Sequence, residues 1–510
     1  MKIEYYLWSI LFLIGCYACY EDKGNYDYEE VNSFEIEKIV TNQVSPYTVG
    51  DTVFASPVLK FALDSNEADL SYEWRLMGGR LIGTDRDLVY VADTVSDNYM
   101  PVFSSLTVTN NKNGLRANGT CIFMVFKKNF QEGWMLLSEK ESKAELNYLI
   151  WKTEYKEGKE VHSFDEYPRV FQQENGMELG GKPIRLQEFW AMGQTSHLLL
   201  LQDGGLGPIC LNGTDYKKTI SVNEEFKNGS FPEGFKPVDA IYGTMNDMLL
   251  NENGDLYLKK RNNPGAYYTG RFPDYPVYFE DGLKISHLIP TSLWNVNFRL
   301  LFDEKNKRYL ALTNDNEIIL LNHDPVSGFS NLYDMGNMDL VFCEAFQEMN
   351  GNISSFFSIY RNKDTGKYYM QKFSVQISGN VQTINLVYDK EFPGQNLINE
   401  NSVFKITKDV RQYLYFSGGA ANDQLYCYIF DAGGSVVYPL YDYAGRRIMK
   451  MFPTNVQRSK LGVALSDGKF CLMEASFAAI GSGSEILCET EEKYGKIVDV
   501  IYKFVQYGSN

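Results

Sequence analysis

Histidine is scarce in this chain of 510 residues, and the six cysteines beyond the N-terminal segment are scattered. Its four histidines are His162, His197, His287 and His323. None of them lies in an HExxH motif or at another paired spacing, so the sequence argues against a zinc site, and no cofactor is expected. Beyond Cys16 and Cys19 at the N-terminus, the remaining six cysteines are scattered and contain no CxxC pair, which argues against a dense disulfide scaffold. Cys471 and Cys488 form the one pair for which a bridge is considered.

Basic residues are outnumbered, and long apolar runs are missing. The chain has 49 Lys and Arg against 65 Asp and Glu, a formal net charge of −16. This balance would repel a phosphate backbone, so nucleic acid is not expected as a partner. Beyond the N-terminus no stretch reaches the roughly 18 apolar residues of a membrane helix. The body is therefore expected to be soluble, and attached to a membrane only through a lipid.

The N-terminus has the pattern of an export leader. Lys2 precedes a short apolar run that ends in Leu13-Ile14-Gly15-Cys16. A small residue before a cysteine, after branched apolar residues, is what a lipoprotein signal peptidase accepts, and the lipid on that cysteine anchors the protein. We therefore predict a leader at 1–15 with Cys16 as lipid anchor and Cys19 as the alternative. The polar, acidic stretch at 16–35 is predicted to be a tether.

Residues 36–129 are predicted to form a β-sandwich. Short apolar strands alternate with turn residues, and the stretch Leu70-Ser71-Tyr72-Glu73-Trp74 alternates cleanly between the two faces of a strand. Trp74 is expected to be the core tryptophan. The predicted strands are 34–40, 52–61, 70–76, 88–91, 102–109 and 120–127.

Residues 130–510 are predicted to form a seven-bladed β-propeller. A unit of two apolar strands around a turn recurs at intervals of about 50 to 60 residues, which in an all-β chain indicates one four-stranded blade per repeat. The alternative is a row of separate sandwiches. The strand at 498–505 could complete the first blade and so close the ring. The seven hairpins are expected at 134–150, 197–211, 248–258, 298–321, 356–373, 413–430 and 461–473.

Aromatic residues make up 15% of the chain and gather in loops between the repeats. Exposed rings can stack on sugar faces or clamp an extended peptide, while charged and amide groups take hydroxyls. The alternative is that these rings only cover the gaps between blades, and His197 is expected to be a core residue. The candidate ligand-binding residues are Tyr267, Tyr268, Arg271, Tyr275, Tyr278, Trp294, Tyr441, Tyr443 and Arg446.

Three stretches resemble the PKD-like family of lipoproteins from gut Gram-negative anaerobes. The most specific is Cys19-Tyr20-Glu21-Asp22-Lys23-Gly24-Asn25-Tyr26-Asp27-Tyr28. The strand Tyr72-x-Trp74 looks like that of a PKD-type Ig-like domain, and the segment at 133–139 extends the similarity. The resemblance implies an outer-membrane lipoprotein, facing outside the cell, that accompanies a starch-utilisation-type import system. In that family the cysteine before the Tyr-Glu-Asp-Lys stretch carries the lipid, which favours Cys19 over Cys16.

Together these observations predict a binding protein rather than an enzyme. We expect a cell-surface lipoprotein that binds a glycan or peptide for an outer-membrane nutrient importer, with the transporter and neighbouring surface lipoproteins as partners. One alternative is a propeller glycosidase or lyase that uses carboxylates in the central channel. The other is a scaffold that docks partner lipoproteins through an apolar patch.

Overall fold

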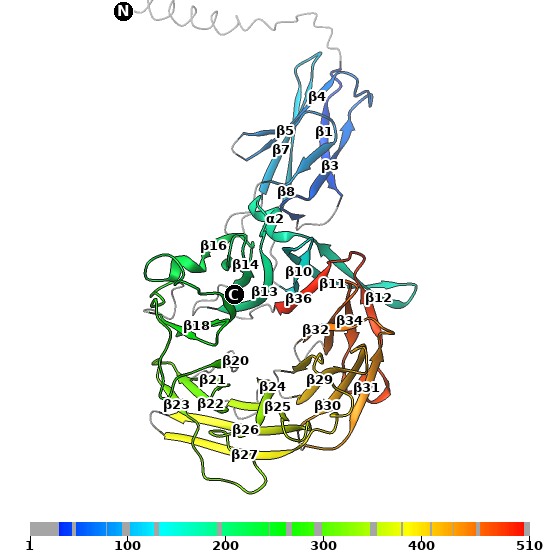
Figure 1. Ribbon diagram of the computed structural model, residues 1–510. Helices are drawn as coiled ribbons and strands as arrows, with labels where there is room; N and C mark the ends of the chain where they lie inside the picture. The colour runs from blue at the N-terminus through cyan, green and yellow to red at the C-terminus, as the bar shows by residue number, and fades with distance from the viewer. Residues whose placement is uncertain are drawn as a thin grey trace, which may run out of the picture. The chain divides into compact units, whose positions relative to one another are not determined.

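The computed structural model divides the chain into two compact units, Met1–Lys128 and Asn129–Asn510 (Figure 1). The leader, both candidate lipid anchors and most of the tether lie outside the residues that the structure describes. The described residues are 30–42, 47–77, 79–93, 102–126, 132–190, 196–243, 245–261, 268–289, 298–346, 354–378, 381–407, 411–431, 433–454 and 459–503.

The N-terminal unit is a β-sandwich of two antiparallel sheets. Its strands alternate buried and exposed residues, as a sheet with one face on a core requires. One sheet has the order β1 (Phe34–Thr41), β3 (Thr52–Phe61), β6 (Leu88–Val91). The other has the order β5 (Leu81–Gly83), β4 (Leu70–Leu76), β7 (Val102–Asn110), β8 (Arg116–Phe123). A short parallel pair joins β2 (Tyr47–Thr48) to β9 (Val125–Phe126).

Trp74 is completely buried at the centre of this sandwich, as predicted. It pairs with Leu106 across β4 and β7. Its indole Nε1 donates a hydrogen bond to the carbonyl of Asp85 at 3.0 Å, which satisfies the one polar atom of the ring. The core prediction for this unit is therefore confirmed at its central residue.

The C-terminal unit is all-β and propeller-like, with seven antiparallel sheets in its described part. The first two have the orders β36 (Lys496–Lys503), β10 (Gly133–Lys140), β11 (Lys143–Lys156), β12 (Lys159–Tyr167), and β13 (Lys182–Trp190), β14 (Ser196–Asp203), β15 (Ile209–Asn212), β16 (Lys218–Ser221). The third is β17 (Pro237–Tyr242), β18 (Asn246–Asn251), β19 (Leu256–Lys260), and the fourth is β20 (Ile285–Ile289), β21 (Phe298–Asp303), β22 (Arg308–Thr313), β23 (Ile318–Leu320). The fifth is β24 (Met338–Phe346), β25 (Ser354–Asn362), β26 (Tyr368–Ser378), β27 (Val381–Glu391). The sixth is β28 (Phe404–Ile406), β29 (Tyr413–Gly418), β30 (Gln424–Ile429), β31 (Val437–Asp442), and the seventh is β32 (Ile448–Pro453), β33 (Lys460–Leu465), β34 (Phe470–Glu474), β35 (Ile486–Glu489). Short helices α2 (Val170–Asn175), α3 (Phe477–Ser482) and the 3₁₀ turn η1 (Val222–Glu225) connect strands.

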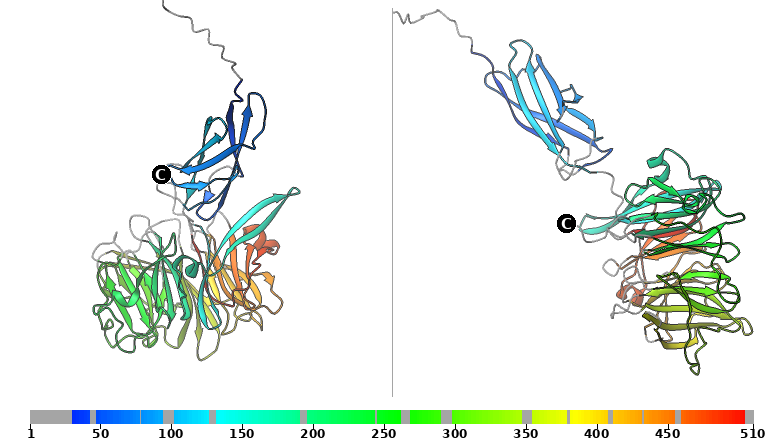
Figure 2. Two further views of the ribbon diagram at one scale, coloured as in Figure 1. Left: turned by 90° about the horizontal axis from the view of Figure 1, so that it is seen from above. Right: turned by 90° about the vertical axis from the view of Figure 1, so that its left-hand side faces the viewer.

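The sheets follow one another around a common centre, and two further views show them side by side (Figures 1 and 2). Each first strand contacts the first strand of the next sheet, from β13 through β17, β20, β24 and β28 to β32. The C-terminal strand β36 contacts both β32 and β13, and it pairs antiparallel with β10. Apolar side chains fill the spaces between neighbouring sheets, which is why two-strand units that cannot bury a face alone are stable together.

The third sheet differs from the prediction of four strands per repeat, because it has three. The chain after β19 contains Pro273 and Pro276, which have no N–H to donate to a ladder. It is held instead by single backbone bonds. Phe272 N–H donates to the Glu225 carbonyl at 2.9 Å, and Val277 N–H donates to the Leu256 carbonyl at 2.7 Å.

Candidate functional site

The segment at 268–284, which takes the place of the missing strand, presents two tyrosines to solvent. Tyr275 is 72% exposed and Tyr278 is 84% exposed. We call these two residues the tyrosine shelf. Arg271, a third predicted residue of this segment, is also exposed, whereas Tyr267 and Trp294 lie outside the described residues.

The backbone beneath the tyrosine shelf is anchored to the protein. Phe272 is buried and stacks on Phe226, with ring centroids 5.1 Å apart and an interplanar angle of 25°. Asp274 accepts a hydrogen bond from the amide of Asn228 at 2.5 Å, and Val277 packs against the core between the third and fourth sheets. The exposed rings therefore project from a fixed segment, so little conformational entropy is lost when a ligand stacks on them.

Tyr268, predicted to bind ligand, is half-buried and packs against the core between the second and third sheets. Its hydroxyl contacts Thr219 Oγ1 at 2.7 Å and His197 Nδ1 at 3.0 Å. Burial, together with the nearby Arg261, lowers the pKa of His197 to about 4, so the imidazole is neutral at pH 7. His197 is a buried residue with a satisfied ring nitrogen, in agreement with the core role expected for it.

The second predicted cluster packs two sheets together. Tyr443 is only 2% exposed, and its hydroxyl donates to the sulfur of Met473 at 2.7 Å. The Tyr441 ring lies 4.9 Å from the Tyr443 ring, and Arg446 pairs with Glu489 at 2.7 Å. The prediction of Tyr443 as a surface ligand-binding residue is therefore wrong, because its ring belongs to the core between the sixth and seventh sheets.

Charged residues line the first strands around the axis of the unit. Arg185 on β13 pairs with Asp239 on β17, and Lys405 on β28 pairs with Glu344 on β24 at 2.5 Å. Asp499 on β36 accepts a hydrogen bond from Leu186 N–H at 2.9 Å. Each of these three carboxylates is therefore engaged by an ion pair or a hydrogen bond within the described chain.

A further carboxylate on a first strand has a strongly shifted pKa. Glu188 on β13 accepts a hydrogen bond from Ser196 Oγ at 2.6 Å. Burial raises the pKa of Glu188 to about 7, against the opposing effects of Lys503 and Ser196. Burial likewise lowers the pKa of Lys503 to about 8. A carboxyl group that titrates near neutral pH is a feature of many active sites, although ion-pair networks also produce it.

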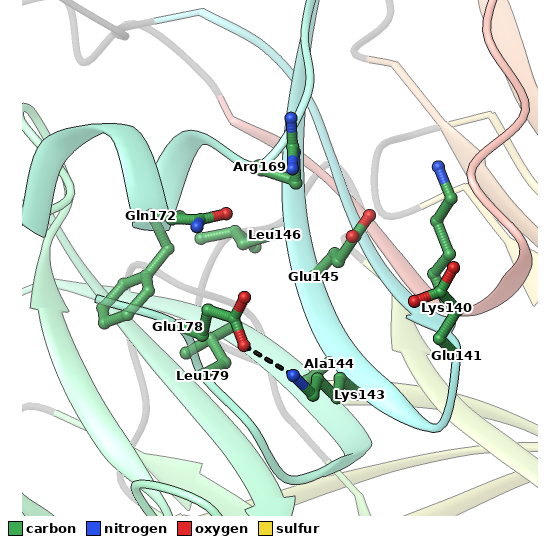
Figure 3. Close-up of a pocket in the computed structure, with 11 residues that line it drawn as sticks. Lys140, Glu141, Lys143, Ala144, Glu145, Leu146, Arg169, Gln172, Glu178 and Leu179 are labelled. Atoms are coloured by element: carbon green, nitrogen blue, oxygen red, sulfur yellow. Dashed lines mark hydrogen bonds and ion pairs between the residues drawn. The ribbon is translucent and has the colours of Figure 1, made fainter. Parts of the chain in front are cut away.

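A small cavity of about 130 Å³ lies beside the turn between β10 and β11 (Figure 3). Arg169, Glu145 and Lys140 line it, and Lys143 pairs with Glu178 at 2.8 Å along its edge. Burial raises the pKa of Glu145, while the two cations oppose that shift. The sequence predicts only a hairpin for this stretch. The signal that could have indicated the cavity is the dense charge of Glu139-Lys140-Glu141-Ser142-Lys143.

The cysteines of the described chain are free thiols, including Cys471 and Cys488. Cys488 lies opposite Leu472 in the β34–β35 ladder, whereas Cys471 lies opposite Glu489. Neighbouring residues of a strand point to opposite faces, so the two thiols cannot meet and the considered bridge is not formed. Cys471 Sγ instead contacts a Glu489 carboxylate oxygen at 3.1 Å.

The described ranges contain no group of three His, Cys, Asp or Glu side chains placed to hold a metal ion. Within the same ranges, no helix has the length and apolar character needed to cross a membrane.

Comparison with known proteins gives one sequence family and several solved structures of similar fold. No curated protein matches the chain. A putative 6-phosphogluconolactonase from Bacteroides fragilis NCTC 9343 is 11% identical with a TM-score of 0.42, over 73% of this chain and 98% of that one. AztD from Citrobacter koseri is 12% identical with a TM-score of 0.36, over 84% and 98%. These likenesses concern the fold alone, and no activity is transferred from them. Residues 19–183 match the PKD-like family, so the chain from Cys19 through the β-sandwich to the start of β13 carries the sequence of that family.

Proposed function

We propose that this chain is a cell-surface lipoprotein that captures a glycan or peptide as an accessory of an outer-membrane nutrient import system. The leader sequence that ends at Cys16, with Cys19 as the alternative anchor, supports export and lipidation. The acidic residues Glu21 and Asp22 resemble the signal for the outer face of the membrane. The PKD-like stretch at 19–183 agrees with an extracellular binding role.

The observation that carries the proposal is the tyrosine shelf. Large exposed rings on an anchored segment bounded by prolines leave apolar surface in water, which is unfavourable unless a ligand covers it. Stacking on a sugar or peptide would bury that area. The hydroxyls of Tyr275 and Tyr278 remain available for hydrogen bonds at the rim of such a contact.

We further infer that the seven sheets form a closed seven-bladed propeller, with β36 as the innermost strand of the first blade. The contacts of β36 with β32 and β13 support this inference. A closed ring leaves only short, protected sheet edges, and so provides a rigid base for exposed binding loops.

The two alternatives predict different surfaces. An enzyme with a pair of channel carboxylates would need one of them to carry a proton. Glu188, with its pKa raised to about 7, is the candidate for that role, whereas the other three carboxylates described above are engaged by ion pairs or a hydrogen bond. A scaffold draws support from the outer face of the first sandwich sheet, where the exposed Phe54 lies directly opposite the exposed Val89. If the protein bound nothing on a glycan and peptide array, yet co-purified with a co-expressed importer, scaffolding would replace capture.

The double substitution Tyr275→Ala with Tyr278→Ala tests capture directly. On an array of glycans and peptides, we expect it to weaken retention of the bound probe about 10-fold or more, roughly 1.4 kcal/mol, because two stacking surfaces are lost. Thermal unfolding should be unchanged, since both rings lie outside the core. Tyr155→Ala is the matched control, because Tyr155 is 75% exposed on the β11–β12 hairpin of the same unit. Equal retention by the double variant and wild type would refute the site.

Lipidation is tested in a Gram-negative host that takes up an alkyne-labelled fatty acid. The full chain should incorporate the label, and either Cys16→Ala or Cys19→Ala should abolish it while the other variant keeps it. An unlabelled wild-type protein would contradict the anchored state, and label retained in the variant with both substitutions would exclude both cysteines.

A further inference from the structure

A second polar centre lies between the third and fourth sheets, where Asn246 begins β18 and Arg299 follows the first residue of β21. Arg299 is only 6% exposed. Its one hydrogen-bond acceptor in the described chain is the carbonyl of Phe298, which receives Nη1 at 3.3 Å. A guanidinium has five N–H donors, so most of those of Arg299 have no partner among the described residues.

The nearest carboxylate cannot pair with Arg299, because its oxygens are already occupied. Asp247 Oδ1 accepts from Arg261 Nη2 at 2.9 Å and from Gly243 N–H at 3.2 Å. Asp247 Oδ2 accepts from Arg261 Nε at 3.2 Å and pairs with Lys259 at 2.9 Å. Arg299 forms no direct ion pair within the described ranges, and the attraction of Asp247 only partly offsets the effect of burial on its pKa.

Asn246 adds an unused acceptor at the same place. Its side-chain Nδ2 donates to the carbonyl of Thr313 at 3.1 Å and to Asn316 Oδ1 at 3.2 Å. Its Oδ1 is buried and accepts nothing, although the residue is 1% exposed. Because both neighbours of Nδ2 are acceptors, they fix the orientation of the amide. Oδ1 is then left without a hydrogen-bond donor.

The backbone is shaped to admit the guanidinium. Gly243 N–H is held by the Asn246 carbonyl at 3.1 Å, and a Cβ at Gly243 would overlap Arg299 Nη2. Gly243 therefore touches both residues: its backbone binds Asn246, and its missing side chain leaves the space that Arg299 fills. Burial lowers the pKa of Arg299 to about 10, so the group stays charged at neutral pH.

We propose that Arg299 and Asn246 form a subsite for a carboxylate with a neighbouring hydroxyl, the arrangement found in uronic acid residues of acidic glycans. The guanidinium binds the carboxylate in a two-pronged contact, and the hydroxyl donates to Asn246 Oδ1. A free, fully ionised sulfate or phosphate ion could use Arg299 but would leave Asn246 unsatisfied, since it has no proton to donate. This subsite rests on the proposed capture function and names the class of glycan that it selects.

The test uses the whole soluble protein and two probes of equal length, trigalacturonate and the neutral trigalactose. The wild-type protein should bind trigalacturonate at least about 10-fold more tightly, because a charge-assisted pair is worth more than a neutral hydrogen bond. Arg299→Gln should abolish this preference, Arg299→Lys should keep part of it, and Asn246→Ala should weaken it. Arg361→Gln, an exposed arginine on β25, is the control that should change nothing.

The wild-type comparison decides the proposal even if Arg299→Gln fails to fold. Equal affinity for the two sugars overturns the subsite while leaving glycan capture intact. Preference for a peptide with a free C-terminal carboxylate over trigalacturonate overturns the uronate assignment. Binding of neither sugar, together with an array without glycan hits, counts against the proposed capture of glycans itself.

Discussion

At the scale of single residues, tyrosines from similar aromatic stretches are exposed in one case and buried in another. Tyr275 and Tyr278 point to solvent, whereas Tyr443 is in the core, although all three lie in aromatic, turn-rich stretches. The difference comes from tertiary packing. The Tyr443 hydroxyl donates to the Met473 sulfur between the sixth and seventh sheets, and no local sequence pattern predicts that contact. Ring clusters in a sequence therefore predict that aromatic residues gather, but not which of them face water.

The buried polar centre also lay beyond sequence reasoning. Gly243 and Asn246 are close in sequence, but Arg299 lies on the strand of the next sheet, and each of the three is unremarkable in its own segment. Their meeting depends on which strand ends coincide between neighbouring sheets. A signal existed only in retrospect, as a charged residue inside the apolar run Phe298-Arg299-Leu300-Leu301.

Glu188 makes a pH-dependent contribution to stability. Its pKa is raised from 4.5 in the unfolded chain to about 7 in the fold, so between these values the fold binds more protons than the unfolded state. Stability from this group is therefore present at low pH and declines as the pH rises through that window. Glu188→Gln should remove the decline, and relative to wild type it should gain about 1 to 3 kcal/mol between pH 4.5 and pH 7.

Urea unfolding at a series of pH values measures this difference, and staying below pH 8 avoids the titration of Lys503. Wild-type and Glu188→Gln curves that run parallel across the window would show that Glu188 is solvated in the native protein.

At the scale of elements, the hairpins could be predicted and the strands around them could not. The seven predicted two-strand units correspond to pairs such as β18–β19 and β33–β34, because long apolar runs around an Asx- or Gly-containing turn are strong local signals. Some outer strands are short, for example β23 with three residues, and these depend on the neighbouring strand for their form. The C-terminal strand predicted at 498–505 is found as β36, paired with β10.

The packing between first and last sheets can be tested with a glycine pair. A side chain at Gly462 on β33 would overlap the rings of Phe470 and Trp134, which lie 5.1 Å apart across the seventh and first sheets. Gly462→Ala should destabilise the protein by about 1 to 3 kcal/mol through overpacking. Gly434→Ala is the control, since a Cβ there meets nothing within 4 Å. Equal unfolding midpoints for the two variants would mean that the first and seventh sheets are not packed together in solution.

At the scale of the whole molecule, the chain combines a predicted leader, a β-sandwich unit and a propeller-like unit, with a net charge of −16. The charge argues against nucleic acid as a partner, and periodicity indicated the repeated sheets. The ligand could not be predicted, because it is selected by a few side chains that the fold brings together from distant segments. Capture and conversion of a glycan would look alike at the level of fold and composition.

Mass spectrometry of the ligand separates capture from catalysis most directly. The purified soluble protein is incubated with a mixture of short neutral and uronic-acid oligosaccharides, and both the retained and the free sugars are weighed. Capture predicts saturable retention of a subset, released on denaturation with unchanged mass. The contradicting result is the time-dependent appearance of shorter sugars that is lost in Glu188→Gln, which would make the chain an enzyme.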